Sequence, residues 1–130
     1  MGSEMCIRDR VVGNFSDQLT VSAGGTFTFD LSQGTVVLGG ITTSVTSWNF
    51  TNVNPDNSKA TTVTLINNAG IGYTYGDSCT VNGATIANGI KWVGGNPPPA
   101  TANDDILTFS IVRDSTGVTR VYCSSSINII

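Results

Sequence analysis

The sequence predicts an all-β fold, namely an antiparallel β-sandwich of jelly-roll-like type with about eight or nine short strands. Three observations lead to this prediction. Runs in which apolar and polar residues alternate recur along the chain, and no stretch has the period of an amphipathic helix. Gly, Asn, Asp and Pro separate these runs at short intervals, as they do in turns between strands. Thr and Val are frequent within the runs, and both residues favour strands.

The first half of the chain contains five strand-like runs, at residues 18–21, 26–31, 35–38, 44–52 and 60–67. In the second run, Phe27, Phe29 and Leu31 alternate with polar residues, so these side chains are expected to face the core. Val63 and Leu65 are expected to share the buried face of the fifth run. The sequence Asn-Pro-Asp-Asn at residues 54–57 is a strong turn signal between the fourth and fifth runs.

The second half is divided into shorter pieces by glycines. Residues 79–81 and 90–93 form two short runs, which are expected to pair with each other. Residues 105–112 alternate over a longer run, and Asp-Ser-Thr-Gly at residues 114–117 predicts a hairpin loop. Residues 118–123 are then expected to return antiparallel to that run.

The chain is organised around residues 89–112, where two strand-like runs are joined by a Gly-Gly-Asn-Pro-Pro-Pro linker. Three successive prolines have a fixed φ and no N–H group, so this linker can be neither helix nor central strand and is expected on the surface. Trp92 precedes the linker and shares a strand face with Ile90 at a period of two, which predicts that Trp92 is a core anchor.

These residues also carry a resemblance to a known family. Lys91-Trp92, Gly94-Gly95, Pro97-Pro98 and the strand from Asp105 to Phe109 occur together and in this order. In this respect the chain resembles the C-terminal β domain of tail-fibre and other virion structural proteins of tailed bacteriophages, from about residue 25 to residue 127. The residues that form the structural signature are Trp92, Gly94, Gly95, Pro97, Pro98 and Asp105. The chain departs from the pattern by a third proline at Pro99 and a cysteine at Cys123.

The resemblance implies a place and a role. A domain of this kind lies at or near the end of a tail fibre or neck appendage, within a homotrimer that attaches to a receptor on the host surface. The receptor is then a host-surface glycan or protein, and the domain is located in the virion, assembled in the host cytoplasm and extracellular after release. The isoleucines at 127, 129 and 130 are expected to form a frayed apolar tail in a monomer and to be buried around a three-fold axis in such a trimer.

The first ten residues resemble a translated sequencing adaptor. The string MGSEMCIRDR matches one reading frame of a transposon-derived adaptor, as expected for a metagenomic fragment. We therefore expect residues 1–10 to be a disordered artefact and residues 11–130 to be a single domain that is truncated at its N-terminus. Leaving out these ten residues removes two basic and two acidic side chains, so the formal net charge stays at −3. A mildly acidic chain without a basic patch is not expected to bind nucleic acid, and no apolar run is long enough to predict a membrane span.

Two cysteines remain, Cys79 and Cys123, and both are expected to be reduced thiols in a phage protein assembled in a reducing cytoplasm. With no histidine in the chain, two thiols cannot complete a zinc site, so no metal is expected. The glycine-rich run at residues 70–76 misses the dinucleotide fingerprint by one position and is interpreted as a loop, so no cofactor is expected.

Catalysis has no support in the sequence. Asp104 and Asp105 are adjacent, so on a strand they point to opposite faces and cannot flank one glycosidic bond. Asp105 is expected to cap a turn or to accept hydrogen bonds from loop amides. Without histidine, the serines at 124–126 lack the base of a usual triad. The protein is therefore not expected to be an enzyme.

Binding remains, and the candidate surface residues are Tyr73, Tyr75 and Asn96. The two tyrosines are flanked by glycines and could offer an aromatic platform for a sugar ring, while a nearby amide could bond its hydroxyls. Two alternatives to a receptor-contacting virion domain stay open, namely a free-standing carbohydrate-binding module and a bacterial adhesin domain.

Overall fold

The computed structural model describes residues 15–16, 25–39, 41, 43–67 and 73–130. Within these residues, every regular secondary-structure element is a β-strand, so the predicted all-β class is confirmed. The strand expected at residues 18–21 and the first ten residues lie outside the described part of the chain. The described residues include no helix that is both long enough and apolar enough to cross a membrane.

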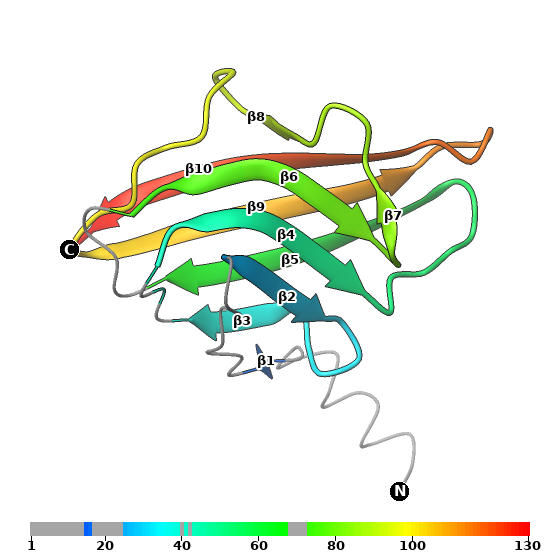
Figure 1. Cartoon of the computed structure of the whole chain (residues 1–130). Coiled ribbons are helices and arrows are strands. Elements are labelled where there is room, and N and C mark those ends of the chain that lie inside the picture. The colour runs from blue at the N-terminus through cyan, green and yellow to red at the C-terminus, as the bar shows by residue number, and fades with distance from the viewer. Residues whose placement is uncertain (1–14, 17–24, 40, 42, 68–72) are drawn as a thin grey trace, which may run out of the picture.

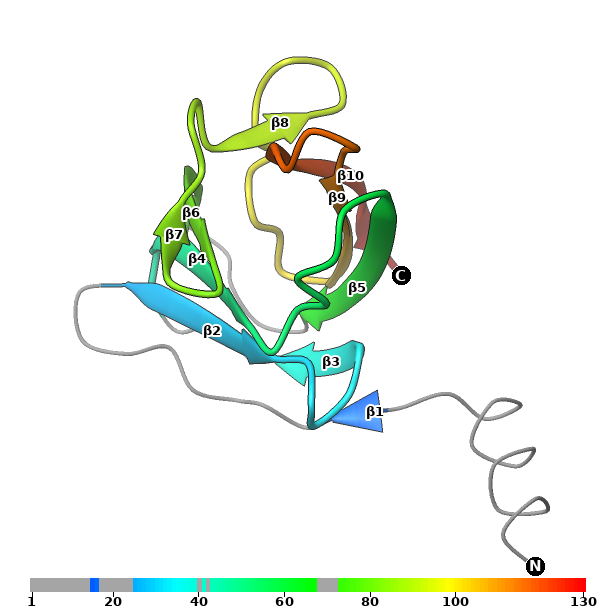
Figure 2. The same ribbon diagram turned by 90° about the vertical axis from the view of Figure 1, so that its right-hand side faces the viewer.

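Within the described residues, ten strands form two sheets that face each other (Figure 1). The six-stranded sheet has the order β1-β3-β5-β9-β10-β8, and the four-stranded sheet has the order β2-β4-β6-β7. Figure 2 shows the two sheets from the end, with β2, β4, β6 and β7 on one side and β3, β5, β9 and β10 on the other. The strand bounds are β1 Phe15–Ser16, β2 Thr26–Asp30, β3 Val36–Gly39, β4 Val45–Thr51, β5 Lys59–Asn67, β6 Tyr75–Val81, β7 Ala84–Thr85, β8 Ile90–Trp92, β9 Asp104–Arg113 and β10 Thr119–Ile129.

The expected antiparallel, jelly-roll-like pairing is wrong, because both sheets are mixed. β1, β3 and β5 pair parallel in one sheet, and β2, β4 and β6 pair parallel in the other. The reason lies in the strand order: from β1 to β6, successive strands alternate between the two sheets, so no strand is followed by its own neighbour in the sheet. A strand that re-enters a sheet after a full circuit points in the same direction as its predecessor and therefore pairs parallel.

Two further pairing predictions have opposite outcomes. β9 and β10 form the predicted antiparallel hairpin, with Val121 opposite Ile111. The runs at residues 79–81 and 90–93 do not pair with each other, which corrects that prediction: β6 pairs with β4 and β7, whereas β8 runs parallel to β10 at the edge of the larger sheet. The turn after β6 returns β7 along the smaller sheet, and the chain then crosses over.

The core lies between the sheets and is rich in aromatic side chains. Phe27 and Phe29 are fully buried, as predicted, and parallel pairing aligns them with Trp48 and Phe50 of β4. Phe109 of β9 closes this cluster from the opposite sheet, with ring centroids 5.0 Å from Trp48 and 5.4 Å from Phe29. Such tilted aromatic pairs add to the stabilisation from buried area, so the cluster fixes how the two sheets stack. Val63 and Leu65 are also fully buried, which confirms the inward face of β5.

β10 extends further than the sequence indicates. It pairs with β9 as far as Ile129, opposite Asp104, with a register shift between Ser126 and Ile129. Asn128 in this irregularity has a φ of 58°, a conformation that Asn tolerates better than most residues. Ile127 and Ile129 are thus part of the strand, at 37% and 40% exposure, and the expected frayed tail is reduced to Ile130.

Candidate functional site

Trp92, the central residue of the structural signature, lies in the core. It is 8% exposed on β8, and its indole Nε1 donates to Asp77 Oδ1 at 2.9 Å. Ile90 is buried on the same face, as its spacing predicts. Trp92 therefore positions β8 against the sandwich and does not form a ligand platform.

Asp105 is the other signature residue with a defined structural role. Its buried carboxylate accepts hydrogen bonds from the Thr101 backbone and hydroxyl, at 2.9 and 2.6 Å, and from the Asn128 backbone at 3.0 Å. These contacts agree with the expectation that Asp105 bonds loop amides. Burial alone would raise the pKa of Asp105, but the bonds from Thr101, Asn128 and Tyr75 outweigh it and lower the pKa below its ordinary value.

Tyr75 is not a surface residue, which corrects its assignment as a candidate binding platform. It is 2% exposed at the start of β6, and its hydroxyl donates to Asp105 Oδ2 at 2.9 Å. The same hydroxyl accepts from Asn67 Nδ2 at 2.8 Å. Burial raises the pKa of Tyr75, so its proton stays in place. The flanking glycines suggested a loop here, but the alternation that includes Tyr75, Cys79 and Val81 belongs to a strand.

The remaining predicted residues are spread over the surface. Tyr73 is half-buried against the core, and Asn96 is exposed at the tip of the linker. Gly94 and Gly95 both have a φ of 89°, which explains why this turn uses glycine. Pro97 and Pro98 are partly exposed, so the linker lies on the surface as predicted. None of these residues lines either of the two cavities described below.

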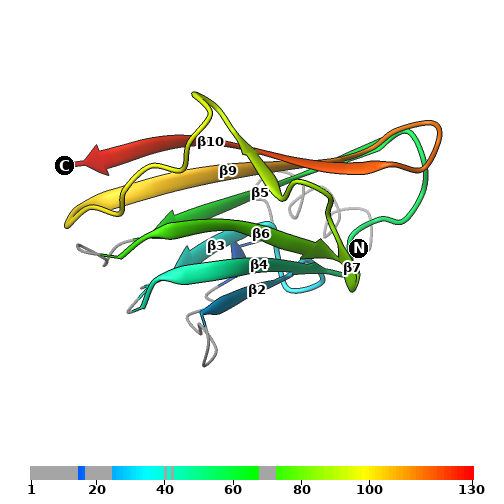
Figure 3. The same cartoon turned by 45° about the horizontal axis from the view of Figure 1, so that its top comes forward.

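A cleft of about 460 Å³ opens instead at one end of the sandwich. Its volume is within the range of about 300–1,000 Å³ that is usual for small-molecule sites. The floor consists of side chains that are 8% exposed or less, contributed by both sheets: Val53, Val81, Ile86 and Ile111. Figure 3 shows the β4–β5 loop, β7 and the tip of the β9–β10 hairpin gathered at this end.

Three turns position the wall of the cleft. At the start of the β4–β5 loop, Asn54 Oδ1 accepts a hydrogen bond from the backbone N–H of Asp56 at 2.9 Å, which agrees with the predicted turn. Asn82 and Gly83, both with positive φ, form the two-residue hairpin turn between β6 and β7. The side chain of Asn82 bonds both backbone groups of Val53, at 3.0 and 2.8 Å, and so ties this turn to the end of β4.

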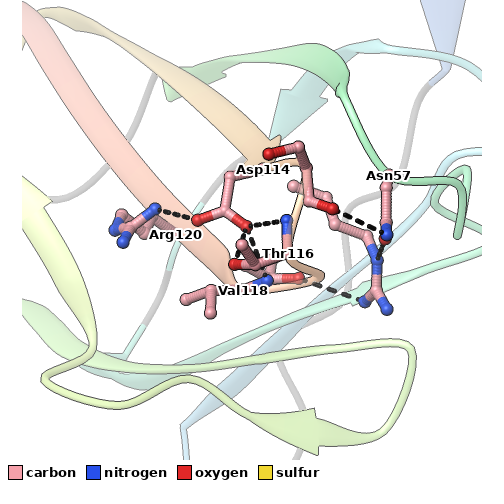
Figure 4. Close-up of polar contacts among 8 residues, drawn as sticks. Asn57, Asp114, Thr116, Val118 and Arg120 are labelled. Atoms are coloured by element: carbon pink, nitrogen blue, oxygen red, sulfur yellow. Dashed lines mark hydrogen bonds and ion pairs between the residues drawn. The ribbon is translucent and has the colours of Figure 1, made fainter.

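The third turn, in the β9–β10 hairpin, is organised by Asp114 (Figure 4). One carboxylate oxygen accepts from the backbone of Thr116 and of Val118, at 2.9 and 3.0 Å, and from the Thr116 hydroxyl at 2.6 Å. The other oxygen forms an ion pair with Arg120 at 2.8 Å. The bonds from Thr116, Val118 and Arg120 hold the pKa of this carboxyl well below its ordinary value.

The lip of the cleft is polar and basic. Lys59, Arg113 and Thr119 end the inward-facing rows of β5, β9 and β10, where the two sheets no longer fill the space between them. Asn54 and Thr85 complete the polar rim from the other side. Among the residues that the structure describes, no acidic and no aromatic side chain lines the cleft. It is therefore suited to a polar ligand held by hydrogen bonds above an apolar floor.

Sequence reasoning did not find this site, although two signals for it were present. Asn-Gly between two short alternating runs indicates a two-residue hairpin, and Asn82-Gly83 is such a pair. Lys59 and Arg113 each lie just outside an apolar run, where a strand leaves the core. The spatial meeting of these residues depends on the strand pairing.

A smaller hollow of about 310 Å³ shares Thr85 and Ile86 with the cleft. Its lining includes Asp77, whose carboxylate is bonded to Trp92, and the buried thiol of Cys79. Cys79 and Cys123 are both free and buried, as expected, and burial raises the pKa of these thiols to about 11 and about 12. At neutral pH both therefore remain protonated and unreactive.

Comparison with known proteins identifies no relative of this chain: no protein-family model, no curated protein and no solved structure matches it. The function must therefore be inferred from the cleft and from the resemblance carried by the signature residues.

Proposed function

We propose that this domain is a structural part of a phage virion, in a tail fibre or neck appendage, and that its end cleft contacts a host-surface glycan. The virion assignment is supported by the order of Lys91-Trp92, Gly94-Gly95, Pro97-Pro98 and Asp105 in the sequence. The role is binding and not catalysis, since Asp105 is committed to structural hydrogen bonds and the chain contains no histidine.

One observation carries the glycan-binding part, namely the composition of the cleft. Sugar rings present apolar C–H faces and polar hydroxyl edges, and the cleft offers an apolar floor below hydroxyl, amide and cationic groups. Because no aromatic side chain of the described part of the chain lines it, we expect hydrogen bonds and not ring stacking to supply the specificity. Several such modules in one fibre would raise a weak affinity through multivalency.

The test is an NMR titration of the ¹⁵N-labelled full chain with neutral and acidic oligosaccharides. Amide shifts are expected in residues 53–55, 82–87 and 113–119, which surround the cleft. Ala84→Trp should abolish them, because Ala84 lines the mouth of the cleft and the indole would fill it. Ala102→Trp, at an exposed residue that does not line the cleft, is the matched control. Shifts confined to Tyr73 and Asn96 would move the site to the linker surface.

The two alternatives, a carbohydrate-binding module and a bacterial adhesin domain, would use the same cleft. Genomic context separates them from the virion domain. Neighbouring tail or neck genes on the parent contig would support the phage assignment, whereas a glycoside hydrolase in the same reading frame would support the binding module.

A further inference from the structure

We propose that the cleft selects a sugar residue that carries a carboxylate, such as a uronic or sialic acid, through the cation pair of Lys59 and Arg113. This inference rests on the proposed glycan-binding function and specifies its ligand class.

Positive charge is concentrated at the cleft end of an acidic protein. Beyond residue 10, the basic residues are Lys59, Lys91, Arg113 and Arg120, while the formal net charge of the chain is −3. Lys59 and Arg113 line the cleft, whereas Arg120 of the same hairpin does not line it and forms an ion pair with Asp114. Only Lys91 lies elsewhere, on β8. A cleft with one sign of charge raises the local concentration of ligands of the opposite sign.

Lys59 and Arg113 lie directly opposite each other in the sheet. They are partners in the antiparallel β5–β9 ladder, at its last register position. Like charges in this arrangement destabilise a strand pair, so the pair is unfavourable unless an anion bridges it. Among the described residues, no acidic side chain lines the cleft and neither cation forms an ion pair. The neighbouring Asp114 is committed to Arg120, Thr116 and Val118 (Figure 4).

The guanidinium of Arg113 is held in place but not saturated. Its Nε donates to Asn57 Oδ1 at 2.8 Å, and its Nη1 reaches the Thr119 hydroxyl at 3.5 Å. Asn57 is fixed in turn by donating to the Ser115 carbonyl at 3.3 Å. Within the described residues, Nη2 and the Lys59 ammonium make no hydrogen bond. A fixed guanidinium with a free donor suits the planar geometry of a carboxylate.

Gly117 leaves room for this arrangement. A Cβ atom at this position would lie 3.3 Å from Arg113 Nη2, closer than most packed atoms tolerate, and in ordinary contact with Asn57 Oδ1 at 3.5 Å. The glycine therefore keeps the free edge of the guanidinium accessible. A carboxylate at the lip would place the attached sugar ring over the floor formed by Val81, Ile86 and Ile111.

The experiment compares ligands that differ only in charge. The full chain is titrated with tri-galacturonate and its methyl ester, and with sialyl-lactose and lactose. At least one acidic sugar should bind about tenfold more tightly than its neutral partner, as expected for a hydrogen-bonded charge. The difference should shrink at high salt, because the lip is open to solvent.

Charge variants test the residues. Lys59→Gln and Arg113→Gln should each lower the affinity for the acidic sugar about tenfold and lower that for the neutral partner by a clearly smaller factor. Arg113→Lys should have an intermediate effect, because Lys keeps the positive charge but lacks the planar set of N–H donors of the guanidinium. Lys91→Gln makes the same change of charge away from the cleft and should have no effect. Should Arg113→Gln not fold, Lys59→Gln still tests the pair, because the exposed Lys59 side chain makes no contact that folding requires.

The outcomes separate the inference from the function. Equal affinity for acidic and neutral sugars, with shifts around the cleft, would overturn the carboxylate selection and leave glycan binding intact. An effect of Lys91→Gln as large as that of Lys59→Gln would also overturn it, because the attraction would then be that of the whole molecule. If neither pair of sugars shifts any cleft residue, both the inference and the proposed glycan binding fail.

Discussion

At the scale of single residues, the buried carboxylate of Asp105 joins parts of the chain that are far apart in sequence. It bonds Tyr75 at the start of β6, the Thr101 loop and the irregular end of β10 at Asn128. Each of these donors would lack a partner if the carboxylate were lost, and unsatisfied buried groups are costly. Asp105 therefore stabilises the end of the sandwich that lies opposite the cleft.

Asp105→Asn should lower the free energy of unfolding by about 3 kcal/mol, because an amide cannot accept all the bonds that the carboxylate accepts. The adjacent Asp104→Asn is the control, since Asp104 is exposed and no hydrogen bond of its side chain is seen. Urea unfolding of both variants measures the difference. Equal stability of the two variants would contradict the assigned role.

The same carboxylate predicts a pH dependence. The pKa of Asp105 is lowered in the folded state, against about 3.9 in the unfolded chain. Its contribution is thus fully present above the unfolded pKa and is lost as the pH falls through the folded pKa. Stability should decline below about pH 4 and decline less steeply in Asp105→Asn. Asp30 and Asp114, whose pKa values are also lowered, leave a residual slope in that variant.

Trp92→Ala should cost on the order of 3–5 kcal/mol, because a large side chain that is 8% exposed leaves a cavity under β8. The neighbouring Val93→Ala should change stability by less than about 0.5 kcal/mol, since Val93 is 74% exposed. Thermal unfolding of the two variants tests the contrast. A Trp92→Ala protein as stable as the parent, but unable to bind a glycan, would reverse the assignment of Trp92 to the core.

At the scale of elements, the β9–β10 hairpin turn shapes the cleft. Gly117 has a φ of 90°, and its position against Arg113 makes the turn sensitive to any side chain. The turn at Gly94 has a similar φ of 89° but open space around it. A substitution at Gly94 therefore introduces backbone strain alone, whereas a substitution at Gly117 introduces backbone strain and a contact with Arg113.

Gly117→Ala and Gly94→Ala should each cost about 1–2 kcal/mol through backbone strain at positive φ. Only Gly117→Ala should also weaken binding of the acidic sugar, because its methyl group would displace Arg113. Calorimetric unfolding gives the first quantity and the NMR titration gives the second. Equal losses of binding in the two variants would mean that the position of Arg113 does not matter.

At the scale of the whole molecule, the C-terminus lies at one end of the sandwich, and β7 and the tip of the β9–β10 hairpin lie at the other end, as Figures 1 and 3 show. Residues of β7 and of this hairpin line the cleft, so the cleft lies at the end opposite the C-terminus. Ile127, Ile129 and Ile130 leave apolar surface exposed at the C-terminal end. An assembly through this end would leave the clefts of all copies open and directed away from the contact. The homotrimer that the resemblance implies stays a prediction, and in such an assembly the binding sites would face outward.

If these side chains form the contact, replacing all three isoleucines by Ser should convert a trimer into a monomer without unfolding the domain. Burial of one such side chain contributes about 1.5–3 kcal/mol before ordering costs, so the triple change is large enough to detect. Light scattering over a concentration series measures the mass, and Val93→Ser controls for loss of an exposed apolar side chain elsewhere. A parent chain that stays monomeric throughout would show that these residues do not suffice for assembly.

The sequence by itself determined most of the longer strands and the inner faces of β2 and β5. Alternation predicted that Phe27, Phe29, Val63 and Leu65 face inward, and all four are fully buried. It did so because side-chain direction along a strand depends only on local backbone geometry. The β9–β10 hairpin was equally accessible, since Asp114 and Gly117 specify a local turn.

Apart from the β9–β10 hairpin, only the tertiary structure decided which strands pair, and it alone decided where the cleft lies. A turn signal marks where the chain changes direction, but it does not say whether the next strand stays in the same sheet or crosses to the other. This choice depends on burial of side chains distant in sequence, such as Phe109 against Trp48, and it makes β2, β4 and β6 parallel. The same long-range packing buries Tyr75, which its flanking glycines suggested was exposed, and places Lys59 opposite Arg113. Local sequence patterns predict which side chains of a strand point inward. A site made from three turns forms only when the packing of the whole core brings those turns together.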